Sequence, residues 1–99
     1  MNCIRTDNET ESRLQVEGSL DALTASDIRP IFDKVVADRR RRVVLDIELL
    51  TLLDSSGVGA IVSLYKRLKA DGGRFTVVGA RDQPLAVLKL LKLDRVFGI

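Results

Sequence analysis

Apolar runs with strand-like spacing alternate with amphipathic helical segments along this 99-residue chain. Residues 43–47 form a mainly β-branched apolar run, which predicts a strand buried on both faces, and residues 75–79 form a similar run. Between them, apolar residues recur at the spacing of one helix face: Val58, Ile61, Val62, Tyr65 and Leu68. Strand–helix–strand units favour parallel strands joined by right-handed crossovers, so this alternation predicts an α/β fold.

Further elements are expected before this unit. Residues 3–6 and 13–17 have strand character, and Gly18 is expected to end the second strand. A helix follows, because apolar residues recur at helical spacing between Ile28 and Val36.

The start of this helix stays open between two positions. Thr24 with Asp27 resembles a capping box, but that start would place Pro30, which lacks a backbone donor, deep in the helix. A start at Ser26 or Asp27 would bring Pro30 nearer the first turn.

The C-terminal part predicts one more helix and a short edge strand. Asp82 is a plausible cap, Pro84 falls near the first turn, and residues 96–99 could add the strand. The helix would bury an apolar stripe formed by Leu85, Leu88 and Leu91. Together the elements predict one domain over residues 1–99, with a mixed, largely parallel sheet of four to five strands and three to four helices mainly on one face.

Composition narrows the possible functions. The chain has no histidine and one cysteine, Cys3, so histidine-based nucleophilic sites, zinc sites and an internal disulfide are excluded. We therefore expect no catalytic residues, metal site or cofactor. No apolar run reaches the roughly 20 residues that span a bilayer, and the N-terminus lacks the pattern of a signal peptide, so a cytoplasmic protein without a membrane partner is expected.

Basic residues are clustered only at residues 39–42, where four arginines are consecutive. They could form a phosphate-binding patch or simply complement the negative end of a helix dipole. We favour the helix-end interpretation and expect no nucleic-acid partner, because the net charge is only +2 and the four aromatic residues are scattered.

An abrupt change of character occurs at Asp54-Ser55-Ser56-Gly57, where the apolar run gives way to the central helix. Free backbone N–H groups gather at a helix start, and the dipole there favours negative charge. Either serine could cap the helix, and Gly57 could allow close approach of another chain. From these residues alone, a capped turn without further function is the simpler interpretation.

An ordered set of segments resembles the STAS domain family. The segments are GSLD at residues 18–21, VVLD at 43–46, DSSGVGA at 54–60, YKRLK at 65–69, GG at 72–73 and LLKLDRVF at 90–97. This family comprises the anti-sigma factor antagonists and the cytoplasmic domains of sulphate transporters. The chain departs from the family pattern in ending at Ile99, where longer relatives have a further helix.

The resemblance implies a stand-alone anti-sigma factor antagonist of a partner-switching system. In such proteins the serine after the motif aspartate is phosphorylated, which points to Ser55, with Ser56 as the alternative acceptor. The implied partners are an anti-sigma factor that is also a serine kinase of the histidine-kinase-like ATPase fold, and a PP2C-type phosphatase that removes the phosphate. The phosphate would release the kinase.

The expected partner-binding residues are Asp21, Asp54, Ser56, Gly57, Val58 and Gly59. Asp21 could equally be a turn residue, whereas Gly57, Val58 and Gly59 are expected to form an exposed contact patch. The alternative function is a STAS scaffold or transporter accessory subunit that is not phosphorylated.

Overall fold

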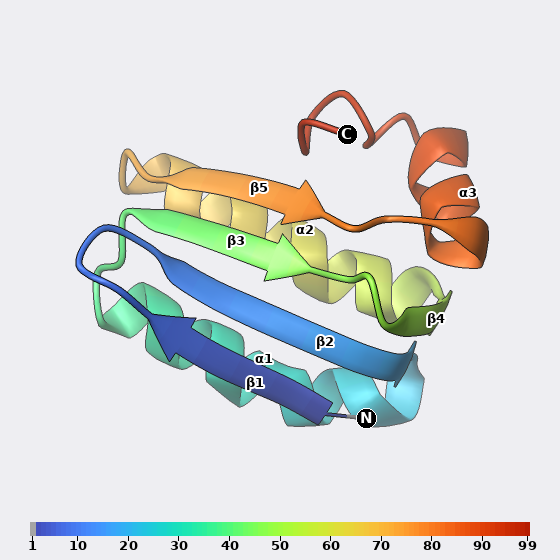
Figure 1. Ribbon diagram of the computed structural model, residues 1–99, viewed down its shortest axis with the longest axis horizontal. Coiled ribbons are helices and arrows are strands. Elements are labelled where there is room, and N and C mark those ends of the chain that lie inside the picture. The colour runs from blue at the N-terminus through green and yellow to red at the C-terminus, as the bar shows by residue number, and fades with distance from the viewer. Residues whose placement is uncertain (1) are drawn as a thin grey trace.

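The computed structural model describes residues 2–99, in which five strands and three helices follow one another along the chain (Figure 1). The strands are β1 (Asn2–Asp7), β2 (Ser12–Leu20), β3 (Arg42–Asp46), β4 (Leu50–Leu53) and β5 (Arg74–Val78). The helices are α1 (Ala22–Ala37), α2 (Ser55–Ala70) and α3 (Asp82–Leu90).

The sheet is mixed and largely parallel. Its strands lie in the order β1-β2-β3-β5, and β4 pairs with the carboxyl end of β2. β1 runs antiparallel to β2, whereas β2 pairs in parallel with β3 and β4, and β3 with β5. The predicted fold class is therefore confirmed.

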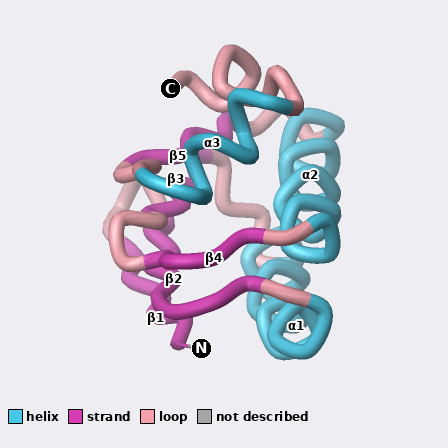
Figure 2. The backbone as a smooth tube through the Cα atoms, turned by 90° about the vertical axis from the view of Figure 1, so that its right-hand side faces the viewer, coloured by secondary structure: helices cyan, strands magenta, loops and turns pink. Residues whose placement is uncertain are grey.

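Helices α1 and α2 lie along one face of the sheet, and α3 lies beside β4 (Figure 2). The core between sheet and helices is built from large apolar side chains, among them Leu14, Leu45, Ile28, Phe32, Ile61 and Leu64. The opposite face carries both polar and apolar side chains, and an ion pair of 2.9 Å joins Arg13 to Asp46 on it. Val44 of β3 lies on this face and is only half-buried, so β3 is not fully buried on both faces as the sequence predicted.

Three strand predictions need correction. β2 does not end at Gly18 but continues to Leu20, because Gly18 adopts a φ of +89° at a register shift between β2 and β4. β4 is a strand that the sequence does not reveal, since four residues of a leucine-rich run show no clear period. Residues 96–99 form turns rather than an edge strand, although the carbonyl of Phe97 accepts a hydrogen bond of 3.2 Å from the Val77 N–H.

Two helix starts also differ from expectation. α1 begins at Ala22, earlier than either predicted start, because Asp21 is its N-cap and Thr24 completes the capping box as the third helical residue. Pro30 therefore lies inside α1, at an exposed position. The N-cap of α3 is Arg81 rather than Asp82, and its side chain makes no capping hydrogen bond. No helix among residues 2–99 combines the length and apolar character needed to cross a membrane.

Candidate functional site

Two helix starts meet at the carboxyl end of the parallel strands. β2 leads into α1 and β4 leads into α2, and Leu20 pairs with Leu53 at the ends of these two strands. The Asp54 N–H donates to the Leu20 carbonyl at 3.2 Å, which fixes the two chain segments to each other. Figure 2 shows both strand-to-helix connections on the same side of the molecule. The structure thus brings the Asp21 and Asp54 corners together.

Asp54, not a serine, caps α2. Its backbone is extended, with φ −111°, and its carboxylate accepts a hydrogen bond of 3.0 Å from the Gly57 N–H. The possibility that Ser55 or Ser56 caps this helix is therefore not realised. Ser55 is instead the first residue of α2 and is exposed, whereas Ser56 is half-buried. The helix start consequently presents the Ser55 side chain to solvent.

The surroundings of Ser55 suit a negative charge. The first backbone N–H groups of a helix lack intrahelical acceptors, and the helix dipole places a partial positive charge at this end. Only one of the first N–H groups of α2 is engaged by the Asp54 carboxylate. A phosphate on Ser55 could therefore be accommodated without unwinding α2.

Gly57 serves the packing of α2 rather than an exposed surface. A Cβ atom at this position would lie 2.6 Å from the Leu20 carbonyl oxygen and 2.8 Å from side-chain atoms of Leu20 and Leu53. Val58 is also buried, with 8% of its surface exposed. The expected exposed patch of Gly57, Val58 and Gly59 is therefore wrong at its first two members. Gly59 alone is exposed, and a Cβ atom added there would have open space around it, with nothing within 4 Å.

Asp21 has a clear role within the chain. Its carboxylate accepts hydrogen bonds from the N–H groups of Leu23 at 3.0 Å and Thr24 at 3.1 Å. The bond from the Thr24 N–H is the main reason why the pKa of Asp21 lies below its ordinary value. The Thr24 hydroxyl in turn donates to the Ser19 carbonyl at 2.9 Å. Asp21 is thus a helix cap, and its contact with a partner stays a prediction.

Comparison with known proteins identifies the family. The sequence profile described as the STAS domain matches residues 5–99, almost the whole chain. The chain belongs to the STAS domain family. An anti-sigma F factor antagonist of Paenibacillus polymyxa is 31% identical over 87 residues, which cover 87% of this STAS domain and 72% of that protein.

Solved structures agree with this assignment. The crystal structure of an anti-sigma factor antagonist from Mycobacterium paratuberculosis is 27% identical and covers 97% of this STAS domain and 81% of that chain, with a TM-score of 0.88. The phosphorylated form of the Bacillus cell fate determinant SpoIIAA has the same fold, with a TM-score of 0.78 at 20% identity and coverage of 95% and 86% of the two chains.

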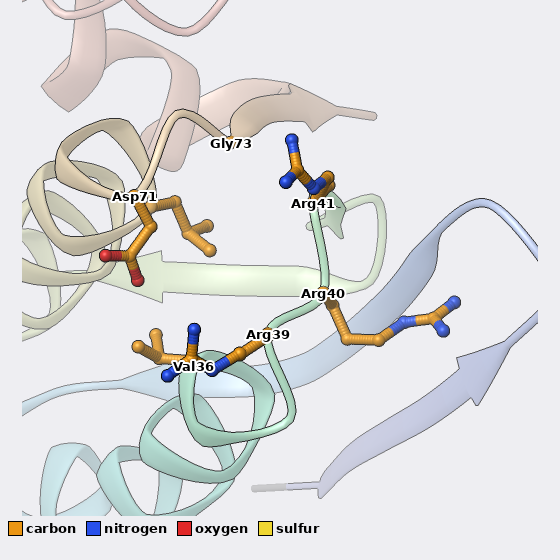
Figure 3. Close-up of a pocket in the computed structure, with 7 residues that line it drawn as sticks. Val36, Arg39, Arg40, Arg41, Asp71 and Gly73 are labelled. Carbon is orange, nitrogen blue, oxygen red and sulfur yellow. The ribbon is translucent and has the colours of Figure 1, made fainter.

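The arginine cluster of this STAS domain lies at the other end of the sheet, where α1 and α2 end. Arg39, Arg40 and Arg41 line a cavity of about 140 Å³ together with Asp71 (Figure 3). Arg40 extends away from Asp71 and donates hydrogen bonds to the Ser12 hydroxyl at 2.8 Å and the Glu11 carbonyl at 2.9 Å. Arg40 therefore stabilises the fold, and the position of the cluster agrees with the helix-end interpretation.

Sequence reasoning missed one side chain near Ser55. The side-chain amide of Gln83 in α3 makes two hydrogen bonds to the backbone of Leu53, two residues before Ser55. No local pattern signals such a contact, because it joins residues that are 30 positions apart. Among residues 2–99, no group of three or more acidic or cysteine side chains is arranged to hold a metal ion.

Proposed function

We propose that this STAS domain is a cytoplasmic anti-sigma factor antagonist whose binding to an anti-sigma factor kinase ends when Ser55 is phosphorylated. The kinase would have the histidine-kinase-like ATPase fold, and a PP2C-type phosphatase would restore the free hydroxyl. One observation carries the proposal: Ser55 is exposed at the first position of α2, directly after the Asp54 cap.

Accessibility supports Ser55 over Ser56 as the acceptor. A kinase must bring the γ-phosphate of ATP in line with the attacking hydroxyl, which requires an open approach to the serine. Ser55 is exposed, whereas Ser56 is half-buried within the first turn of α2. The proposed binding surface comprises Asp21, Asp54, Ser56 and Gly59 around Ser55, and it excludes the buried Gly57 and Val58.

Electrostatics can account for the release. Phosphorylation replaces a neutral hydroxyl by about −1.5 to −2 charges beside the Asp54 carboxylate. Asp54 is charged in both the free and the bound chain, so the change in binding must come from the interface, where two like charges about 4 Å apart repel by about 4 kcal/mol at an effective dielectric constant near 20. A loss of about 2.7 kcal/mol weakens binding a hundredfold. A partner surface that fits the hydroxyl would therefore reject the phosphate without any refolding.

Two relatives support the same function. The Paenibacillus polymyxa relative bears the name anti-sigma F factor antagonist, and the structurally similar Bacillus protein is known in a phosphorylated form. We extend both properties to this chain because its DSSG segment forms an exposed serine at a helix start.

Site mapping tests the proposal. The purified chain is incubated with a recombinant anti-sigma factor kinase of this ATPase class and Mg-ATP, and modified residues are located by mass spectrometry. We expect one phosphate on Ser55, no phosphate on Ser55→Ala, and normal phosphorylation of Ser56→Ala. Phosphate that persists on Ser56 in Ser55→Ala would overturn the assignment, and an unmodified wild-type chain would overturn the proposed function.

A further inference from the structure

β4, the strand just before Ser55, pairs with the rest of the sheet along only one of its two edges. β4 pairs with β2, and its last contact on that side is the hydrogen bond from the Asp54 N–H to the Leu20 carbonyl. The other edge of β4 faces α3 rather than another strand. Leu53, the last residue of β4, is 1% exposed, so its backbone N–H and carbonyl need partners within the protein.

Gln83 supplies both partners. Its side-chain Oε1 accepts a hydrogen bond of 2.8 Å from the Leu53 N–H, and its Nε2 donates one of 2.9 Å to the Leu53 carbonyl. A primary amide has the same donor and acceptor groups as a peptide unit. Gln83 therefore takes the place that a neighbouring strand would occupy on this edge.

The start of α3 is itself fixed by long-range contacts. Arg81 Nε donates a hydrogen bond of 3.0 Å to the Glu48 carbonyl, in the turn before β4. Asp82, between Arg81 and Gln83, has a φ of +53°, a left-handed conformation that is uncommon outside glycine but that aspartate adopts more readily than most residues. The hydrogen bonds of Arg81 to Glu48 and of Gln83 to Leu53 thus hold the first turn of α3 against β4 and the turn that precedes it.

We infer that Gln83 is a positioning residue for Ser55. This inference rests on the proposed function, and it assigns to α3 the task of holding the strand end from which Ser55 projects. With Leu53 bound on both edges, the Asp54–Ser55 corner has little freedom to move. Phosphoryl transfer depends on alignment of the attacking oxygen, so a loose corner would react slowly even when the kinase is bound.

Two variants and one control separate positioning from general stability. Gln83→Leu keeps the approximate size but removes both hydrogen bonds, whereas Gln83→Glu keeps the acceptor for the Leu53 N–H and loses the donor. Leu90→Ala changes an exposed side chain of the same helix, 82% accessible, and serves as the control. The first readout is amide hydrogen exchange by NMR, with Leu14 as a core reference.

We expect the Leu53 amide to exchange at least about tenfold faster in Gln83→Leu, less so in Gln83→Glu, and as in wild type in Leu90→Ala. The Leu14 amide should stay protected in all variants. Unchanged exchange at Leu53 in both Gln83 variants would overturn the inference, whatever the kinase does.

The second readout is the kinetics of phosphorylation by the recombinant anti-sigma factor kinase. We expect kcat to fall about tenfold in Gln83→Leu, with little change of the KM for the chain, because alignment rather than docking is lost. A kcat equal to that of Leu90→Ala, despite fast exchange at Leu53, would overturn the inference. A wild-type chain that accepts no phosphate would overturn the proposed function and this role of Gln83 together, and the exchange data would still show whether Gln83 holds β4.

Discussion

Asp54, Ser55 and Gly57 lie within one turn of chain, and their side-chain positions face three different surroundings. Asp54 bonds to the helix backbone, Ser55 faces solvent, and Gly57 packs against Leu20 and Leu53. The motif therefore combines a helix start, an accessible hydroxyl and a close contact between α2 and the sheet. Of the three, only Ser55 can be changed without an expected cost to the fold.

Alanine substitutions at Gly57 and Gly59 should change the free energy of unfolding in opposite directions. Gly57→Ala should lower the free energy of unfolding by about 1–3 kcal/mol, because the new methyl group would overlap the Leu20 carbonyl. Gly59→Ala should raise it by about 0.5–1 kcal/mol, since the position is open and alanine favours the helix. Urea unfolding measures both, and equal effects of the two substitutions would contradict the packing role of Gly57.

Asp21 should contribute to the acid sensitivity of the protein. Its folded pKa is lowered, mainly by the hydrogen bond from the Thr24 N–H, so the ionised form stabilises the fold. That contribution is present above the unfolded pKa of about 3.9 and is lost as the pH falls through the lower folded value. Asp21→Asn should therefore reduce the loss of unfolding free energy between pH 5 and pH 3. An unchanged pH profile in urea unfolding would show that this carboxylate is not stabilised by folding.

At the scale of elements, the strongest periodic signals were predicted well. The helical stripes of α1 and α2 show the expected period, because each helix buries one face against the core. The runs that form β3 and β5 lie in strands as predicted, although neither strand is fully buried on both faces. β4 and the start of α1 could not be predicted, because a four-residue strand has no measurable period and the helix cap lay outside the apolar stripe. At the site, the family resemblance pointed to Ser55, whose role as the phosphate acceptor stays a prediction. The burial of Gly57 could not be predicted, because it depends on the tertiary contact with β2.

The capping box of α1 should be tested at Thr24. Its hydroxyl accepts a hydrogen bond of 2.9 Å from the Asp21 N–H and donates one of 2.9 Å to the Ser19 carbonyl. Thr24→Val keeps the shape and removes both bonds, so it should lower the free energy of unfolding by about 1–3 kcal/mol. Ser26→Ala, at an exposed position of the same helix, is the control. A loss no larger than that of the control in urea unfolding would contradict the structural role of the box.

At the scale of the whole molecule, the proposed switch and the core are separate. Ser55 lies at the carboxyl end of the parallel strands, and the arginine cluster lies at the opposite end, beyond the large buried side chains. A charge added at an exposed helix start has no buried group to displace. The phosphate is therefore expected to act on the partner-facing surface and not on the fold.

Phosphorylation should leave the structure of the free domain intact. We expect the chemical shift changes in an NMR spectrum to be confined to the neighbourhood of Ser55 and the adjoining start of α1. The melting temperature should change by no more than a few degrees, because the phosphate faces solvent at the positive end of α2. Shift changes that extend through β5 and the core would indicate a conformational switch instead.

The most direct test compares the affinity of the chain for the anti-sigma factor kinase before and after stoichiometric phosphorylation of Ser55. Isothermal titration calorimetry gives both dissociation constants, and Ser55→Ala, which should bind but resist the switch, is the matched control. Electrostatic repulsion at the interface predicts at least about a hundredfold weaker binding of the phosphorylated chain. Equal affinity of the phosphorylated and unphosphorylated chains would contradict the proposed switch.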